Sequence, residues 1–215
     1  MTMSSFEEFV PPYIRGLHAY SPGKPLRQAQ HESGGSVIKL ASNENPLGPS
    51  PLAVQAAKEA AAHGNFYPDN DNTELRLKLA QKHQVEAEHI LVTAGSTQFL
   101  DIIARTLLSP GLNAVTSEGT FIVYPIAVRA AGGEMLQVPM REHGFDLDAI
   151  ARAINAKTRI VFLANPNNPT GSMFDAAATE AFLARVPQHV LVVLDEASCD
   201  FAVSFAPERG VIYSR

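Results

Sequence analysis

The chain has 215 residues, 46% of them hydrophobic, with a net charge of -5 and a pI near 5.8. A chain of this size and composition can bury a substantial core, so we expect a folded globular protein. The acidic balance and the lack of any run of lysines or arginines argue against nucleic acid or an anionic membrane as partner, and favour a small molecule. No segment resembles a signal peptide or a bilayer span, which predicts a cytoplasmic protein.

Cysteine and histidine usage gives no sign of a disulfide framework or a metal site. The one cysteine, Cys199, cannot form an internal disulfide, and the seven histidines are scattered. A structural zinc site would pair such residues at short spacing. We therefore expect no metal.

The first part of the chain is rich in proline and glycine and predicts an irregular N-terminal arm over residues 1–50, followed by a partial domain over 51–215. Ser50-Pro51 resembles an N-cap followed by proline at the first helical position, and Gly64 resembles a helix stop, so a helix is predicted up to His63. A second helix is predicted over 73–84, behind the turn-forming residues 67–72.

From residue 90 onward, short apolar runs alternate with amphipathic segments. This alternation predicts βαβ units and a mostly parallel sheet. The runs at 159–164 and 189–194 lack polar alternation, which is typical of strands covered on both faces, so these two strands are predicted to be central. The predicted strands are 90–93, 114–117, 134–138, 160–164 and 190–194, and the predicted helices are 98–108, 122–131, 147–154 and 176–186.

Parallel α/β sheets bind ligands beyond the carboxyl ends of their strands, and two segments there can contact a phosphorylated ligand. At 94–98, glycine permits a tight turn and Ser96 or Thr97 can cap the next helix, which leaves backbone N–H groups aimed at an anion. Taken alone, this segment is also an ordinary helix start. At 165–171, Asn-Pro-Asn-Asn-Pro-Thr-Gly follows an apolar run, and its two prolines fix the direction of the asparagine amides.

Two further segments suit an aromatic cationic ring. Asp195 directly follows the last apolar run, where its carboxylate could pair with a protonated ring nitrogen, although a cap of a helix or turn is an equally good interpretation. Phe121, in Gly-Thr-Phe at 119–121, could stack on a planar cofactor, although an isolated phenylalanine at a helix start is more often part of a core.

Together these segments resemble a known family. The segments at 43–46, 66–69, 94–97, 165–171 and 195–197 occur in the order seen in fold-type I aminotransferases, which use pyridoxal phosphate. The chain most resembles the histidinol-phosphate aminotransferases, and residues 14–17 and 20–25 are similar to the arm of that family. The resemblance implies a three-layer α/β/α large domain with a mostly parallel sheet, incomplete because the family's later strands and C-terminal small domain are missing.

The resemblance also implies roles for individual residues in holding pyridoxal 5'-phosphate. Ser96 and Thr97 would hold the phosphate, and Phe121 would stack on the pyridine ring. Asn168 would bond the ring hydroxyl O3', and Asp195 would pair with the pyridinium nitrogen, which keeps the ring able to accept electrons from a substrate carbanion.

Three residues nearer the N-terminus match family positions outside this group. Tyr67 matches a tyrosine that reaches the phosphate of the neighbouring subunit, which implies a homodimer with shared sites. Tyr20 and Asn45 match substrate contacts, although both could simply dock the arm. The implied reaction is transamination between L-histidinol phosphate and 2-oxoglutarate in histidine biosynthesis, so the partners are a small amino donor and a 2-oxo acid.

The chain also departs from the family. No lysine follows Asp195, where the family has its Schiff-base lysine, and the six lysines present lie in the arm, on early helices or before a strand. We therefore expect a C-terminally truncated form with at most cofactor binding and negligible turnover, because transamination uses that amine for covalent and proton-transfer steps. Ser198 replaces a tyrosine, Gln98 an acidic residue and Gly119 a proline. A non-catalytic remnant or binding module, and a relative of threonine-phosphate decarboxylase, stay open as alternatives.

Overall fold

The structure is a computed structural model that describes residues 8–18, 20, 23–45 and 47–202. Its residues form two compact units. We call the first, Met1–His18 with Lys78–Arg215, the sheet unit, and the second, Ala19–Leu77, the arm unit. Each is described by itself.

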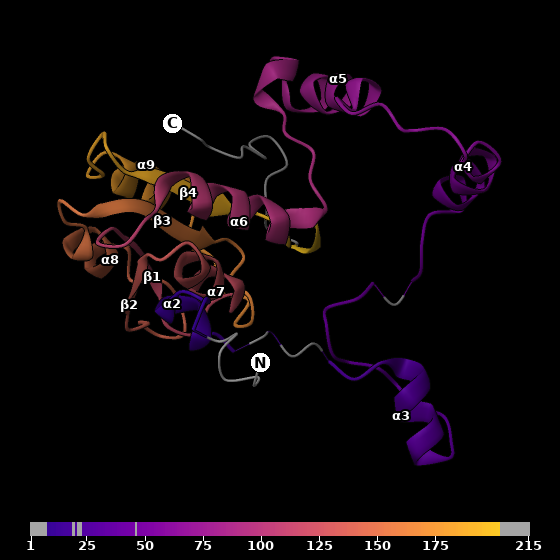
Figure 1. The fold of residues 1–215 in the computed structure, drawn as a ribbon, viewed down its shortest axis with the longest axis horizontal. Coiled ribbons are helices and arrows are strands. Elements are labelled where there is room, and N and C mark those ends of the chain that lie inside the picture. The colour runs from indigo at the N-terminus through magenta and orange to yellow at the C-terminus, as the bar shows by residue number, and fades with distance from the viewer. Residues whose placement is uncertain (1–7, 19, 21–22, 46, 203–215) are drawn as a thin grey trace. The chain divides into compact units, whose positions relative to one another are not determined.

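The sheet unit is built on four parallel strands in the order β2-β1-β3-β4 (Figure 1). Their bounds are β1 Asn113–Ser117, β2 Glu134–Val138, β3 Thr158–Ala164 and β4 Leu191–Asp195. In the register of the last two strands, Ala164 lies beside Asp195. The carboxyl ends of β3 and β4 therefore meet at one edge, and the loops that follow them start side by side.

Helices cover both faces of this sheet. They are α6 Gly95–Leu107, α7 Val123–Ala130, α8 Leu147–Ala153 and α9 Ala176–Leu183. Because side chains alternate along a strand, Ile160 and Phe162 of β3 pack in the cluster with α6 and α7, whereas Val161 packs in the cluster with α8 and α9. The resulting α/β/α layers confirm the predicted fold class, and the run without polar alternation in β3 is explained by burial on both sides.

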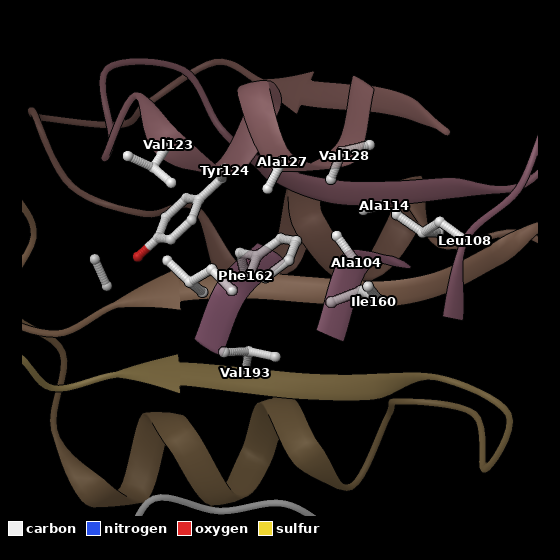
Figure 2. Close-up of a cluster of buried hydrophobic side chains, with 12 residues drawn as sticks. Ala104, Leu108, Ala114, Val123, Tyr124, Ala127, Val128, Ile160, Phe162 and Val193 are labelled. Atoms are coloured by element: carbon white, nitrogen blue, oxygen red, sulfur yellow. The ribbon is translucent and has the colours of Figure 1, made fainter. Parts of the chain in front are cut away.

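The core under α6 and α7 contains a pair of buried, stacked aromatic rings (Figure 2). Tyr124 and Phe162 are both fully buried, and their rings stack with centroids 5.0 Å apart and an interplanar angle of 9°. Figure 2 shows the Tyr124 ring beside Val123 and Phe162, with its hydroxyl directed away from the other labelled side chains. Burial of a side chain of this size stabilises the fold by about 1.5–3 kcal/mol.

Side-chain caps start the two helices on the other face. The carboxylate of Asp146 accepts the N–H of Ala149 at 2.9 Å at the start of α8. Asp175 accepts the N–H of Ala178 at 2.8 Å at the start of α9. Each cap satisfies a backbone donor that has no partner within its helix. The remaining short elements of the sheet unit are α2 Pro12–Arg15, η1 Ala87–His89 and η2 Cys199–Phe201.

The arm unit contains α3 Leu26–Ser33, α4 Pro51–Ala61 and the first residues of α5 Thr73–His83. The predicted helices at 51–63 and 73–84 are thus confirmed within one or two residues. Helix α3 lies in the segment predicted to be irregular, and it ends at Gly34 in the left-handed conformation, a position that favours glycine. None of the described residues between 19 and 77 is buried. The division into an arm over 1–50 and a domain over 51–215 stays a prediction, since the two compact units have different bounds.

Two strand predictions differ from the structure. Residues 90–93 form no strand, although Ile90 has an extended backbone with φ -104° and ψ 123°. An extended segment becomes a strand only when a neighbour completes its hydrogen-bond ladder, and no described strand pairs with this one. β4, predicted to be central, is an edge strand of the described sheet and pairs with β3 alone.

Two broader observations concern the described part of the chain. None of its helices is long and apolar enough to cross a bilayer. No group of three or more histidine, cysteine, aspartate or glutamate side chains among the described residues could hold a metal ion.

Candidate functional site

A pocket lies at the carboxyl edge of the sheet, within the sheet unit. It encloses about 310 Å³, a volume that includes space open to solvent. The backbone N–H of Asn165 donates to the carbonyl of Asp195 at 2.9 Å and holds the two loops together where they leave β3 and β4. The lining residues come from four segments: Ser96, Phe121, Ala164, Pro166, Asn168, Asp195, Ala197 and Ser198.

The carboxylate of Asp195 is held in place through both of its oxygens. The hydroxyl of Tyr124 donates to Oδ2 at 2.8 Å, and the backbone N–H of Ala197 donates to Oδ1 at 3.1 Å. Asp195 itself is half-buried and lines the pocket. Each carboxylate oxygen can accept more than one hydrogen bond. The carboxylate therefore keeps acceptor capacity for a cationic donor in the pocket.

Burial beside this carboxylate changes the pKa of two neighbouring groups. Burial, followed by the charge of Asp195, raises the pKa of Glu196 to about 7. Burial and the negative charge and hydrogen bond of Asp195 together raise the pKa of the Tyr124 phenol well above its usual range. Tyr124 is therefore a neutral hydrogen-bond donor at physiological pH.

The loop after β3 is ordered by its own asparagines. The side chain of Asn165 donates to the carbonyl of Phe174 at 2.9 Å and accepts the N–H of the same residue at 3.2 Å. Asn167 is buried, accepts the hydroxyl of Thr120 at 2.7 Å and donates to the hydroxyl of Thr170 at 2.8 Å. Because Thr120 adjoins Phe121 and Asn167 adjoins Asn168, these contacts fix two pocket-lining residues relative to each other.

The start of α6 borders the pocket through Ser96. Gly95 has a φ of +74°, in the left-handed region that favours glycine, and Ala94 precedes the helix without a side-chain cap. The amide oxygen of Gln98 accepts the N–H of Ala94 at 2.6 Å. The amide thus accepts a backbone bond at the helix start as the acidic residue of the resembled family could, so this departure does not disturb the helix start. Ser96 and Thr97 are both exposed, and of the two only Ser96 is among the lining residues.

The turn before Phe121 requires a glycine. Gly119 has a φ of +62°, which proline cannot adopt, and a Cβ at this position would lie 2.9 Å from the sulfur of Met140. The replacement of proline by Gly119 therefore goes with a different backbone conformation. Phe121 lines the pocket and meets the Tyr124 ring edge to face, with centroids 5.6 Å apart and an interplanar angle of 88°.

The structure brings four of the eight predicted site residues into one pocket: Ser96, Phe121, Asn168 and Asp195. Thr97 adjoins this group in the chain. The other three, Tyr20, Asn45 and Tyr67, belong to the arm unit and are exposed, and Tyr67 is 101% exposed. Their predicted roles depend on contacts outside their own unit.

The sequence reasoning missed Tyr124 and Asn167. Tyr124 carried one usable signal, because it places a hydroxyl among Val123, Ala127 and Val128 on a helix that packs into the core. A buried tyrosine hydroxyl needs a hydrogen-bond partner, and the carboxyl edge of the sheet offers one. Asn167 carried no separate signal, since nothing in the sequence ranks it against Asn165 and Asn168.

The fold and the pocket define a parallel α/β domain with a ligand site at the carboxyl edge of its sheet. The family model of the class I and II aminotransferases matches residues 35–209, which is more than half of the chain. The chain belongs to this aminotransferase family.

Similar proteins of known name agree with this assignment. A histidinol-phosphate aminotransferase 2 from Pseudomonas aeruginosa is 49% identical over 214 residues, which are 98% of this chain and 58% of that protein. A crystal structure of histidinol-phosphate aminotransferase from Sinorhizobium meliloti in complex with pyridoxal-5'-phosphate superposes with a TM-score of 0.84 at 30% identity, and covers 95% of this chain and 55% of that one. Aspartate aminotransferase from Thermus thermophilus with maleate gives a TM-score of 0.74 at 25% identity, over 87% of this chain and 53% of that one. The chain spans about half the length of the relatives it matches.

Proposed function

We propose that this chain provides the pyridoxal-phosphate site of a histidinol-phosphate aminotransferase. The reaction would transfer the amino group of L-histidinol phosphate to 2-oxoglutarate, giving imidazole acetol phosphate and glutamate, in the cytoplasm. The observation that supports the cofactor is the convergence of Asp195, Asn168, Phe121 and Ser96 on one pocket. The names of relatives, one of which is 49% identical, support the proposed substrate.

The donors and acceptors of the pocket fit a phosphorylated pyridine. Asp195 offers a carboxylate for a protonated ring nitrogen, and Asn168 offers an amide for the ring hydroxyl. Phe121 offers an aromatic ring for stacking. When bound, pyridoxal phosphate supplies an electron sink for the substrate carbon. Asp195 supports that role because a carboxylate beside the ring nitrogen favours its protonated form.

The phosphate would lie at the start of α6. Its uncapped backbone N–H groups and the hydroxyls of Ser96 and Thr97 are suitable donors for an anion. We propose that Tyr67 of a second copy completes this site in a homodimer, and that Tyr20 and Asn45 contact the substrate. All three proposals rest on the family resemblance. The exposed state of these residues in the arm unit leaves them available for such contacts.

None of the chain's lysines fits the family's Schiff-base position. Lys24, Lys39 and Lys58 belong to the arm unit, and Lys78 and Lys82 lie on α5. Lys157 immediately precedes β3, whereas the pocket lies where β3 ends. We propose that these 215 residues alone bind the cofactor without a covalent link, and that turnover requires a lysine from outside them. The second candidate function, a binding module without turnover, is favoured by the same observation, since no lysine follows Asp195 in these residues.

Titration of the purified chain with pyridoxal phosphate, followed by absorbance and fluorescence, tests the proposed site. We expect saturable binding that Asp195→Asn weakens about tenfold or more, because a hydrogen bond between charged groups contributes about 1.5–3 kcal/mol. Asp175→Asn is the matched control, since asparagine caps a helix as well as aspartate does and Asp175 does not line the pocket. Unchanged binding by Asp195→Asn would refute the assignment of the pocket.

Borohydride reduction of the same complex tests the role of the lysines. We expect no lysine to retain the cofactor stoichiometrically. A single modified lysine, together with transamination of histidinol phosphate by this chain, would show that one of the six lysines serves and that the non-covalent proposal is wrong. Decarboxylation of threonine phosphate in place of transamination would favour the alternative that the chain is a relative of threonine-phosphate decarboxylase.

A further inference from the structure

Tyr124 makes a contact with the pocket that the proposed function does not use. Its hydroxyl donates to the carboxylate of Asp195 at 2.8 Å, across 71 positions of the sequence. The ring does not line the pocket; it is fully buried behind Phe121 and Asp195. Tyr124 therefore contacts the carboxylate without lining the pocket.

The packing around Tyr124 leaves its ring little freedom. One face stacks on Phe162 of β3 at 5.0 Å, and the ring of Phe121 meets it at an angle of 88°. Both contacts fix the plane of the ring, and α7 fixes its backbone. The hydroxyl consequently has a set position relative to the last residue of β4. It is an ordered donor that loses little entropy when the hydrogen bond forms.

The direction of donation has a chemical consequence. A hydroxyl that donates to a carboxylate stabilises its charged form over its protonated form. A proton shared between a carboxylate and a pyridine nitrogen is then displaced toward the nitrogen. The backbone N–H of Ala197 donates to the other oxygen, so the two donors act in the same direction.

We propose that Tyr124 is a positioning residue that orients the Asp195 carboxylate and keeps the proton on the cofactor's ring nitrogen. This inference rests on the proposed pyridoxal-phosphate site. It adds a residue that touches neither cofactor nor substrate and acts through Asp195. The phenol is suited to this role because burial raises its pKa far above physiological pH, so it donates throughout the working range.

The decisive variant is Tyr124→Phe, which keeps the stacked ring and removes the hydroxyl. The readout is the nitrogen NMR shift of pyridoxal phosphate labelled with nitrogen-15 in its ring, measured on the bound cofactor at a pH where the Asp195–ring nitrogen pair holds one proton. We expect the shift to move toward that of the neutral pyridine, because the loss of one charge-assisted hydrogen bond to the carboxylate lowers the ratio of N–H to O–H forms by about tenfold. Tyr13→Phe, the same change at a half-exposed tyrosine of the sheet unit, is the matched control and should leave the shift unchanged.

A second set of variants separates positioning from a general packing effect. In an Asp195→Asn background, Tyr124→Phe should change neither the nitrogen shift nor the affinity further, because the group through which it acts is gone. Replacement of Tyr124 by a ring-fluorinated tyrosine, a stronger donor, should move the shift toward that of the protonated ring. Equal effects of Tyr124→Phe in both backgrounds, or an unchanged shift in a variant that binds the cofactor, would overturn the inference. Failure of the unaltered chain to bind pyridoxal phosphate would instead overturn the proposed function, and the inference with it.

Discussion

The sheet unit and the arm unit differ in what they bury. In the sheet unit, the described strands and helices enclose two clusters of buried side chains, one on each face of the sheet. In the arm unit, Leu47 and Leu52 are 92% and 83% exposed, and none of the described residues is buried. Local signals such as Pro51 at a helix start act in both units. Only the sheet unit adds the tertiary packing from which most helical stability in proteins comes.

This difference divides the proposed site. Ser96, Phe121, Asn168 and Asp195 are held by a packed scaffold, whereas Tyr20, Asn45 and Tyr67 are presented by a unit without a core. Residues on packed elements keep their geometry without a ligand, and exposed apolar segments gain order only when something covers them. Cofactor binding by the four pocket residues can thus be tested independently of any contact that the arm unit makes.

The largest expected effect is a difference in amide hydrogen exchange between the units. Amides of β1 and β3, which are buried on both faces, should exchange at least about a thousandfold more slowly than those of α4, since exchange protection follows local stability. Exchange measured by NMR or mass spectrometry on the full chain gives both values at once. Equal protection in α4 would contradict the comparison and would show that the arm unit is covered in solution.

Truncation of a core side chain should be the next largest effect. Phe162→Ala removes a fully buried ring that stacks on Tyr124, and should lower the free energy of unfolding by about 3–5 kcal/mol. Leu52→Ala in the arm unit should change it by less than about 0.5 kcal/mol, as expected for an exposed position. Urea titrations followed by circular dichroism measure both.

If Phe162→Ala does not fold, Ile160→Val at a fully buried position of the same strand keeps this test usable. It should cost about 0.5–1.5 kcal/mol. A cost for Leu52→Ala as large as that of the core variant would sink the distinction between the two units.

The charge of Glu196 should give a smaller, pH-dependent effect. Its pKa is about 7 in the folded chain, against 4.5 for the free side chain, because it is partly buried beside Asp195. The folded state therefore binds the proton more tightly than the unfolded state. Ionisation of Glu196 therefore lowers the free energy of unfolding. This loss is absent below pH 4.5, grows as the pH rises toward 7, and is constant above that. Since one pKa unit corresponds to about 1.4 kcal/mol and the group keeps some solvent access, we expect about 2 kcal/mol in total.

Glu196→Gln isolates this contribution. The variant should be more stable than the unaltered chain at pH 8 and should show a weaker loss of stability between pH 5 and pH 8. Urea midpoints across that range provide the measurement, and Glu134→Gln, on β2 and exposed, is the control. If the urea midpoint changed with pH equally in both variants and in the unaltered chain, Glu196 would be solvated in the folded state.

Much of the sheet unit follows from local sequence patterns. The bounds of β2 match the predicted run at 134–138, and α8 and α9 begin as predicted beside aspartates that cap them. The fold class was predicted because the alternation of strand and helix patterns needs no knowledge of distant contacts. The segment at 90–93 was wrongly predicted to be a strand, because a strand also needs a neighbouring strand to pair with.

The candidate site was partly predictable for the same reason. Asp195 and Asn168 were singled out because they follow apolar runs, and the parallel sheet brings the ends of such runs to one edge. Tyr124 was missed because its partner, Asp195, lies 71 positions away and its own segment has the apolar pattern of a core helix. The assignment of functions to these residues stays a prediction, which the cofactor titrations address.

The smallest expected effect concerns the caps of helices in the two units. Asp175→Ala removes an acceptor that bonds the N–H of Ala178 at 2.8 Å, and should cost about 1 kcal/mol of unfolding free energy. Ser50→Ala at the start of α4 should leave it unchanged, because the Ser50 side chain makes no cap hydrogen bond and α4 is not part of a packed core. Asp175→Asn should restore nearly all of the loss, since asparagine supplies the same acceptor. An Asp175→Ala variant as stable as the unaltered chain would mean that water replaces the cap at no cost, whereas a loss in Ser50→Ala would mean that local signals in the arm unit do contribute to the stability of the whole chain.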